Sequence, residues 1–341
     1  MVPCASSDSI LSSLHLDGEL GELEIANKIN SALLASMEIF QPVEAVAPYK
    51  DDPYVFTLSE PAVLAALKQL NPRKAAGPDC VPNWLLREYA KVLDEPVTAI
   101  LNSSYKEQRL PSPSKLADVF PLPKQKPVED LSKQLRPISL TPAISKLAED
   151  FVVSTHVGSA VLKIIDHDQY GRIPKFHPVR SDLDVSPLVT SYRRYQCSCQ
   201  AFDLIDHKIL VAKINGLDMP HSIKAWVTDF LTNRHQRVKL SSDCYSEWSP
   251  VPAGVPQGTM LGPWLFLLMI NDLKVDALTW KYVDDTTISQ TIPRGPLGDV
   301  QHAVTAVEDW SRSQRKQLNA DKCKEMVIDI KKISHNFSPS R

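Results

Sequence analysis

Apolar residues recur at three- and four-residue spacing along much of the chain, and this spacing is typical of one buried face of an α-helix. It predicts helices at residues 19–38, 57–70, 95–108, 143–156, 205–214, 221–232 and 299–318, with a further amphipathic helix late in 71–90 and a buried one within 254–273. Thr57-Leu-Ser-Glu60 has the pattern of a capping box, which predicts the start of the second helix.

Runs rich in β-branched and aromatic residues predict the strands. We expect two extended segments within 118–141, a strand pair at 236–240 and 247–251, a hairpin over 278–290 and a last strand at 325–330. Residues 176–199 carry no sustained period of either kind, although the chain is well patterned on both sides of them. The mixture of helices and strands predicts an α+β fold with one interrupted stretch.

Composition narrows the class of protein only a little. The 341 residues are 43% hydrophobic and 23% charged, which is ordinary for a globular protein, and a net charge of −2 neither indicates nor excludes a nucleic-acid partner. The N-terminus has neither the basic region nor the apolar core of a signal peptide. The longest apolar run, Trp264–Ile270, is far shorter than the roughly 20 residues of a membrane helix. We therefore expect an intracellular protein without a membrane span.

The strongest candidate for chemistry is the pair Asp284 and Asp285 in the string KYVDDTTIS. Side chains alternate along a strand, but at the tip of a hairpin the backbone turns and two adjacent carboxylates can approach one cation. Mg²⁺ prefers oxygen ligands and is the natural candidate. A solvated turn explains most adjacent aspartates, by roughly four to one given the turn preference of aspartate. The aromatic and β-branched neighbours argue against that explanation here.

Two weaker signals accompany this pair. The string GVPQGTMLGP brings small residues and backbone amides to the start of a helix, where a nucleotide or a template backbone can approach closely. Lys124 and Arg136, in the extended segments before residue 141, could grip a triphosphate, with the arginine supplying a bidentate contact. An ordinary turn and a solvated basic loop explain these two signals equally well when each is taken alone.

The order of six strings changes this picture. They are PRKAAGPDCVPNWLL, PLPKQKPVEDLSKQLRPISL, AFDLIDHKIL, GVPQGTMLGPWLF, KYVDDTTIS and LNADKCKEM. In this order and at similar spacing they resemble the successive blocks of a reverse transcriptase domain, with the strongest likeness to those of non-LTR (LINE-type) retrotransposons. The resemblance covers about residues 20–330 and is interrupted at 176–200. It implies the fingers and palm of a right-hand polymerase, an antiparallel sheet flanked by helices, with the thumb absent.

The resemblance also implies a role for each candidate residue. Asp284 and Asp285 would be two of three metal-binding aspartates in a two-Mg²⁺ site that extends a DNA primer on an RNA template with dNTPs. Lys124 and Arg136 would hold the incoming triphosphate. Gln257 and Gly258 would line the template and nucleotide side of the pocket. Phe202 would be the steric gate against a ribose 2′-hydroxyl, and Lys322 would donate a proton to pyrophosphate.

The third aspartate of the family stands before AFD in the pattern Asp-aromatic-x-Lys-Ala-Phe-Asp, and six residues before Asp203 this chain has Cys197. A cysteine is a poor ligand for Mg²⁺ because thiolates are soft. A zinc clip of Cys197, Cys199 and His207 lacks the fourth ligand that a structural site needs. Asp203 itself is roughly 20 Å away along a strand, at about 3.3 Å per residue. We therefore predict a metal site with two of its three carboxylates, and polymerase activity that is nearly abolished.

We attribute this loss to the unpatterned stretch. Our hypothesis is that residues 176 to about 200 are read out of frame, so that the aspartate-bearing strand is missing or replaced by residues 191–200. Nucleotide sequence across codons 170–205 tests this hypothesis, which fails if the DNA contains no in-frame alternative. The predicted organisation is an N-terminal helical extension at 1–55, fingers at 56–175, the aberrant segment at 176–200, the palm at 201–330 and a frayed tail at 331–341.

Three interpretations follow from the sequence. The chain is an RNA-directed DNA polymerase domain by descent with impaired activity, or a non-catalytic nucleic-acid-binding protein that keeps the groove, or a degenerate retroelement fragment without a stable fold. Salt-dependent binding to an RNA/DNA hybrid without primer extension would favour the second interpretation. A failure to unfold cooperatively would favour the third.

Overall fold

The computed structural model describes residues 21–45, 47–50, 52–171, 189–196, 202–292, 300–316, 318–319 and 323–328. The chain divides into two compact units. Unit 1 consists of Met1–Ile164 and Phe202–Met269, and unit 2 consists of Ile165–Ala201 and Ile270–Arg341. Each unit contains both helices and a sheet, so the predicted α+β class is confirmed.

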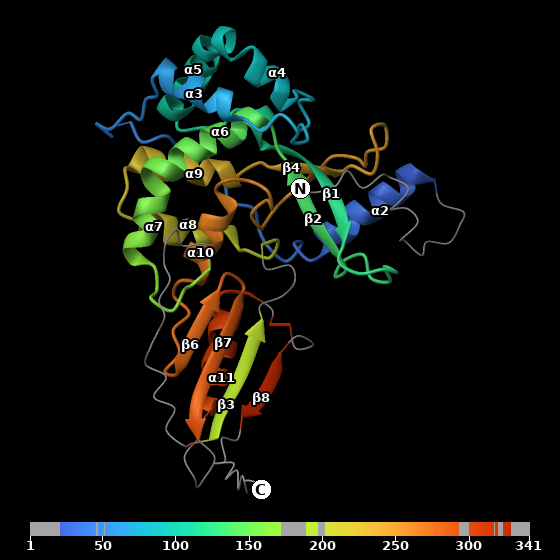
Figure 1. Ribbon diagram of the computed structural model, residues 1–341, viewed down its shortest axis with the longest axis vertical. Helices are drawn as coiled ribbons and strands as arrows, with labels where there is room; N and C mark the ends of the chain where they lie inside the picture. Colours follow the sequence, from blue (N-terminus) through green and yellow to red (C-terminus); the bar gives the residue numbers. More distant parts are fainter. Residues whose placement is uncertain are drawn as a thin grey trace, which may run out of the picture. The chain divides into compact units, whose positions relative to one another are not determined.

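Unit 1 contains a four-stranded sheet in the order β2-β1-β4-β5 (Figure 1). Its strands are β1 (Leu116–Pro123), β2 (Leu135–Leu140), β4 (His235–Val238) and β5 (Ser249–Pro250). The β1–β2 and β4–β5 pairs are antiparallel, whereas β1 and β4 run parallel. The two extended segments predicted before residue 141 and the later strand pair are confirmed, with shorter bounds for the pair.

Helix α2 (Glu22–Ala35) covers one face of this sheet. The apolar cluster between them consists of Ala26, Ile29, Leu33, Val119, Val128, Leu135, Val238, Leu240 and Cys244. A polar contact crosses the same interface, because Gln236 Nε2 donates to Asn30 Oδ1 at 3.1 Å. The amphipathic spacing predicted for residues 19–38 therefore has its physical cause in this sheet.

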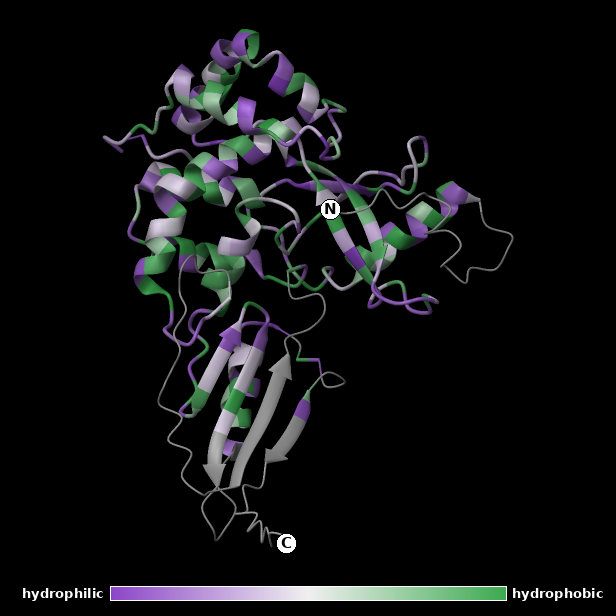
Figure 2. Cartoon of the chain, in the orientation of Figure 1, coloured by the Kyte–Doolittle hydropathy of each residue, from purple (hydrophilic) through white to green (hydrophobic). Residues whose placement is uncertain are grey.

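The other elements of unit 1 are helical: α3 (Glu60–Gln69), α4 (Asn83–Glu88), α5 (Ala90–Glu107), the 3₁₀ turn η1 (Ser112–Lys115), α6 (Ala143–Val152), the π-helical turn η2 (Val153–Val157), α7 (Gly158–Ile164), α8 (His207–Asn215), α9 (His221–Leu231) and α10 (Gly262–Ile270). Helix α9 is buried along most of its length, and its Trp226 donates to Ser104 Oγ of α5 at 2.9 Å. Helix α10 is apolar over residues 265–270 (Figure 2), which fits its burial.

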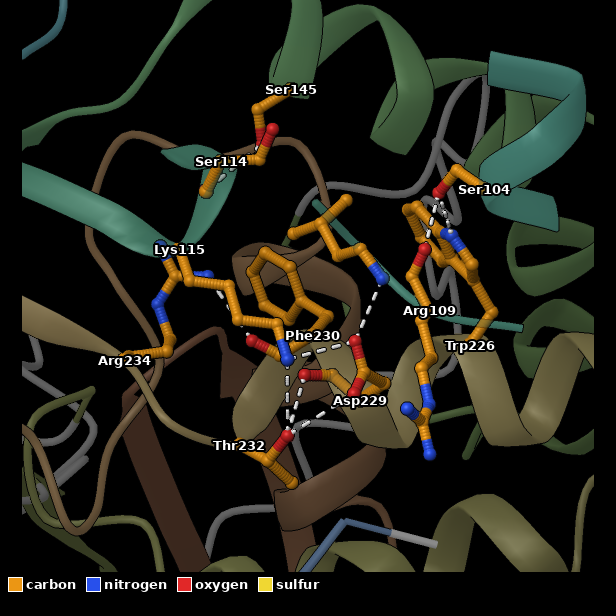
Figure 3. Close-up of polar contacts among 11 residues, drawn as sticks. Ser104, Arg109, Ser114, Lys115, Ser145, Trp226, Asp229, Phe230, Thr232 and Arg234 are labelled. Atoms are coloured by element: carbon orange, nitrogen blue, oxygen red, sulfur yellow. Dashed lines mark hydrogen bonds and ion pairs between the residues drawn. The ribbon is translucent and has the colours of Figure 1, made fainter. Parts of the chain in front are cut away.

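A buried ion pair joins the end of α9 to the 3₁₀ turn η1, directly before β1 (Figure 3). Lys115 Nζ lies 2.8 Å from Asp229 Oδ2 and donates to Thr232 Oγ1 at 3.2 Å, and the backbone N of Leu110 donates to the same carboxylate at 2.7 Å. Both charged side chains are less than a tenth exposed. The pair thus connects the helical part of unit 1 with the sheet.

Unit 2 contains an antiparallel sheet in the order β6-β7-β3-β8, with α11 (Val300–Ser313) beside it (Figure 1). Its strands are β3 (Val189–Gln196), β6 (Leu278–Tyr282), β7 (Asp285–Ile292) and β8 (Lys324–Ile328). Ala303 and Val307 of α11 pack with Ile288 and Leu273 in one buried cluster. The hairpin predicted over 278–290 and the last predicted strand are confirmed.

Some local expectations were wrong. The capping box does not form, because α3 begins only at Glu60 after Ser59, whose side chain makes no capping hydrogen bond. The helix predicted from about residue 95 begins at Ala90 and continues through Pro96. A proline inside a helix removes one hydrogen bond, and the packing of α5 against α3 and α9 outweighs that cost.

Candidate active site

The two adjacent aspartates lie at the tip of the β6–β7 hairpin of unit 2. Tyr282 pairs with Asp285, so Val283 and Asp284 form a two-residue turn. Tight hairpin turns of this length need positive φ angles. Val283 has a φ of 57°, which is unfavourable for a β-branched residue. The turn that presents the carboxylates therefore depends on neighbours that hold it in this conformation.

The segment from Asp168 to Gly171 supplies these neighbours within the same unit. Gln169 Oε1 accepts the backbone N–H of Val283 at 3.1 Å, and Tyr170 N donates to Lys281 O at 2.7 Å. A Cβ atom on Gly171 would lie 2.6 Å from both the backbone N and Cγ2 of Val283. A glycine is required at position 171 because the turn packs directly against its backbone.

A buried lysine fixes β6 close to the turn of the hairpin. Lys281 is 1% exposed, and its Nζ donates to Asp166 Oδ2 at 2.6 Å and to the carbonyl of Leu273. Burial raises the pKa of Asp166, but the hydrogen bond and charge of Lys281 outweigh this effect and lower that pKa below its ordinary value. The pair is therefore an ionised salt bridge that fixes β6 to the segment before residue 170.

Strand β3 brings the chain to the same carboxylates. It pairs with β7 so that its last residue, Gln196, lies opposite Asp285, and it also pairs with β8. Residues 176–199 have no clear period, and residues 191–200 were expected to replace the missing strand; residues 189–196 do form a strand. Cys197 follows Gln196 directly in the sequence and lies outside the described residues, as does Lys322.

The predicted triphosphate ligands lie on the β1–β2 hairpin of unit 1. Arg136 is exposed on β2, opposite Leu122 of β1. Lys124 follows β1, where its backbone N donates to Gln134 O at 2.8 Å and its Nζ to Lys133 O at 2.8 Å. The two cations thus come from opposite arms of one hairpin.

The turn that carries Gln257 and Gly258 packs against the same hairpin. Ser139 N of β2 donates to Gln257 O at 2.7 Å. Gly258 has a φ of 114°, and a Cβ atom there would lie 2.8 Å from Ser139 O. The fold therefore brings Gln257 and Gly258 to the strand that carries Arg136, and the second glycine of GVPQG allows this close approach.

The side chain of Gln257 is held by Asp203. Its Nε2 lies 3.2 and 3.4 Å from the two carboxylate oxygens. Burial raises the pKa of Asp203 to about 7, although the hydrogen bond from Gln257 and the charge of Lys124 oppose this rise. A cavity of about 30 Å³ lies beside Asp203, which is room for one or two water molecules and not for a nucleotide. Asp203 therefore orients the side chain of Gln257.

Phe202, the predicted steric gate, is fixed from two sides. Its ring stacks on Phe266 of α10 with a centroid separation of 4.4 Å and an interplanar angle of 18°. Its carbonyl accepts the N–H of Val255 at 2.8 Å. The ring position is therefore set jointly by α10 and by the glycine-containing turn.

Glu149 is a buried residue that sequence reasoning missed. Its Oε2 accepts the backbone N–H groups of Met260 and Leu261 at 2.8 and 3.1 Å. These are N–H groups at the start of α10, which have no partner inside the helix. Burial raises the pKa of Glu149, while the two N–H donors and the charge of Arg234 oppose that rise. A glutamate on an amphipathic helix carries no sequence signal of this capping role.

The donor chemistry at the hairpin matches a hard cation, since adjacent carboxylates are the ligands that Mg²⁺ prefers. Within the part of the chain that the structure describes, no group of three or more His, Cys, Asp or Glu side chains could hold a metal ion. In the same part of the chain, none of the helices is long and apolar enough to cross a bilayer.

Comparison with known proteins gives a family and several relatives for this chain. Residues 122–337 match the family described as "Reverse transcriptase (RNA-dependent DNA polymerase)". The chain is 26% identical over 306 residues to the RNA-directed DNA polymerase from mobile element jockey of Drosophila melanogaster, covering 82% of the chain and 33% of that relative. It is 24% identical over 334 residues to the probable RNA-directed DNA polymerase from transposon X-element of the same species, covering 91% of the chain and 34% of that relative.

A third relative is the probable RNA-directed DNA polymerase from transposon BS of Drosophila melanogaster, at 25% identity over 309 residues and with 81% of the chain covered. The chain spans about a third of the length of these curated relatives: the aligned region covers 33% or 34% of each relative. The matched region begins at residue 122, near the end of β1, and contains β2, the glycine-containing turn and the carboxylate hairpin.

Proposed function

Because the chain belongs to the reverse transcriptase family, in its non-LTR, LINE-type branch, we propose that it is the fingers and palm of an RNA-directed DNA polymerase with nearly abolished nucleotidyl transfer. We assign the fingers to residues 56–175 and the palm to 201–330, with an extension at 1–55, an aberrant segment at 176–200 and a frayed tail at 331–341. The partners of the chain are an RNA template, a DNA primer and dNTPs, inside the cell.

The proposed mechanism assigns one task to each group. Bound Mg²⁺ ions would activate the primer 3′-hydroxyl and stabilise the leaving pyrophosphate. Asp284 and Asp285 would hold the cations. The other residues act on the nucleotide: Lys124 and Arg136 bind the triphosphate, Gln257 and Gly258 line the template and nucleotide side, Phe202 excludes a 2′-hydroxyl, and Lys322 protonates the pyrophosphate.

The observation that carries the proposal of impaired activity is the register of β3. Gln196 lies opposite Asp285, and the next residue along the chain is Cys197. The family pattern has a metal-binding aspartate at this position. A thiol does not replace a carboxylate as a ligand of Mg²⁺ because its sulfur is soft. The register thus supports a site that lacks its third carboxylate although a strand still leads to it.

Primer extension on an RNA template tests this proposal with the full chain and either Mg²⁺ or Mn²⁺. We expect the wild-type chain to extend a primer at background rate and Cys197→Asp to extend it well above background, because the added carboxylate completes the ligand set. Cys197→Asn, of the same shape but without the charge, and the double variant Cys197→Asp/Asp284→Ala are the controls and should stay at background. Robust wild-type extension that is lost in Asp284→Ala would contradict the proposal.

A second function, nucleic-acid binding without catalysis, is favoured by the unit 1 arrangement. The contact between Ser139 and Gln257 and the exposure of Arg136 do not depend on the number of carboxylates. We expect the chain to bind an RNA/DNA hybrid with an affinity that falls as the salt concentration rises. Lysine and arginine side chains that contact phosphates displace counterions from the nucleic acid, and salt opposes this release. Fluorescence anisotropy with labelled hybrid measures this affinity. A hybrid affinity that does not change with salt would exclude this function.

A further inference from the structure

One arginine of the unit 1 sheet lies on the face opposite α2. Along β4, Gln236 and Val238 are buried toward α2, whereas His235 and Arg237 alternate with them and are half-buried. Alternate residues of a strand point to opposite faces. Arg237 therefore belongs to the face of the sheet that α2 leaves uncovered.

Arg237 is held in place by three contacts. Its guanidinium carbon lies 4.0 Å from the ring centroid of Tyr245 and 4.6 Å from that of Trp248, and its Nε donates to Asp118 Oδ1 at 2.8 Å. Asp118 is 1% exposed, so this hydrogen bond is shielded from water. An arginine fixed by two ring stacks and a charged hydrogen bond has little side-chain freedom left to lose when it binds a ligand.

The donor edge of the same guanidinium is available. Among the described residues, neither Nη atom of Arg237 has a hydrogen-bond partner. Neither atom is among the buried polar atoms without a partner, so both are accessible to a ligand. The two Nη groups of an arginine form a fork that matches the oxygens of a phosphate. Asp118 balances the charge of Arg237, and Lys239, with its Nζ 5.2 Å from the ring centroid of Tyr245, adds a further positive charge.

The aromatic rings beside this fork supply a second kind of contact. Trp248 is 38% exposed although Arg237 stacks on it. Bases of a single strand stack on exposed aromatic rings, whereas the bases of a duplex have their faces covered by each other. A phosphate fork next to an exposed indole is thus suited to a polynucleotide whose bases are unpaired.

We propose that Arg237, Lys239, Tyr245 and Trp248 form a binding surface for single-stranded RNA, with a phosphate on the Nη edge of Arg237 and a base on Trp248. This surface rests on the proposed function, since the RNA would be the template before it pairs with the primer. It adds to that function four residues of unit 1 that have no role in the mechanism proposed above.

Anisotropy titration of the full chain with labelled single-stranded RNA of about 12 nucleotides tests the surface. We expect Trp248→Ala to weaken binding roughly tenfold, because stacking of a base on an aromatic ring is lost. Lys239→Gln should lower the slope of log affinity against log salt by about 0.7, the value for one phosphate contact on a single strand. Arg237→Lys keeps the charge next to Asp118 but removes the fork, and should also weaken binding.

Two variants of unit 1 serve as matched controls. Trp84→Ala removes an exposed tryptophan of α4, and Lys163→Gln removes an exposed lysine of α7. Both should bind single-stranded RNA as the wild type does. Circular dichroism checks that each variant is folded, and Trp248→Ala decides the question if Arg237→Lys does not fold.

The outcomes of this experiment distinguish a failure of the proposed RNA-binding surface from a failure of the proposed function. If Trp248→Ala and Lys239→Gln bind no more weakly than the two controls, the surface is wrong, and normal binding of an RNA/DNA hybrid then leaves the proposed function intact. Equal losses on single-stranded and double-stranded RNA would also overturn the surface, because stacking requires unpaired bases. A wild-type chain that binds neither single strand nor hybrid would overturn both proposals.

Discussion

At the scale of single residues, Asp203 shows how burial changes an ordinary carboxyl. Its carboxylate accepts hydrogen bonds from Gln257, which lower its pKa, but its removal from water outweighs them and raises the pKa to about 7. The folded protein therefore keeps a proton on Asp203 at pH values where the unfolded chain, with a pKa of 3.8, has lost it. Ionising this group above pH 7 costs folding free energy.

The higher pKa of Asp203 in the folded protein predicts that the free energy of unfolding falls as pH rises. Its contribution to the free energy of unfolding is complete below pH 4, falls between about pH 4 and 7, and is lost above pH 7, by as much as about 4 kcal/mol at 1.36 kcal/mol per pKa unit. Asp203→Asn keeps an oxygen acceptor for Gln257 and cannot ionise. Urea midpoints at pH 5.5 and 8 measure the effect. Relative to the wild type, the variant should be more stable at pH 8 than at pH 5.5. An equal difference in midpoint at both pH values would refute this prediction.

Gly254 provides a second prediction at this scale. Its φ is 80°, and a Cβ atom there would lie 2.6 Å from the carbonyl oxygen of Asp203. Gly254→Ala should cost roughly 2 kcal/mol or more of unfolding free energy, because the new methyl meets backbone that cannot move aside. Gly216→Ala is the control, since its nearest contact is an ordinary 3.4 Å and its φ is −77°. Equal unfolding midpoints for the two variants would contradict this account.

At the scale of elements, a buried ion pair connects α9 with η1, the turn directly before β1. Lys115 and Asp229 lie in an environment where an unpaired charge is costly, and their side chains are 8% and 7% exposed. Breaking a buried pair by removing one partner leaves the other charge uncompensated. The carboxylate of Asp229 also receives the N–H of Leu110, so the loop before β1 depends on the same group.

We expect Lys115→Met to lower the free energy of unfolding by about 3 kcal/mol, and the double variant Lys115→Met/Asp229→Leu to recover part of that loss. The exposed pair Lys163–Asp218 has side chains that are 61% and 84% exposed, so Lys163→Met should leave the melting temperature unchanged. Thermal denaturation followed by circular dichroism compares the variants. A double variant less stable than Lys115→Met would show that the charge of Asp229 does not cause the loss.

At the scale of the whole molecule, the two units have separate hydrophobic clusters. In unit 1 the buried residues include Trp226 and Phe230, both without solvent exposure, and in unit 2 the cluster of Leu273, Ile288, Ala303 and Val307 lies between sheet and helix. Cores of this kind argue against a degenerate fragment without a stable fold, because apolar burial is the main force that opposes chain entropy.

The matching prediction is cooperative unfolding. Trp226 is buried in unit 1, so its fluorescence should shift to longer wavelength in a sigmoidal transition as urea is raised, and Lys115→Met should move the midpoint to lower urea. Intrinsic fluorescence across a urea series measures both. A gradual, non-sigmoidal change in the wild type would favour the degenerate fragment instead.

Much of the architecture could be predicted because it is written in local patterns. Apolar spacing located most helices, β-branched runs located the β1–β2 and β6–β7 hairpins, and the order of the motif strings indicated the family. These features depend on residues that are neighbours in sequence, whose burial face and turn preference do not require knowledge of a distant partner. The metal chemistry predicted for residues 284 and 285 also came from the sequence alone, and it stays a prediction.

Other features arise from contacts between distant residues, and local patterns do not encode these contacts. Residues 189–196 lack a clear period, yet they form a strand because β7 and β8 supply backbone partners on both sides. Asp203 meets Gln257, Glu149 caps α10, and Arg237 lies between Tyr245 and Trp248 only because the chain folds back on itself. A period in sequence says which face of an element is buried; which group lies against that face is settled by packing across the fold.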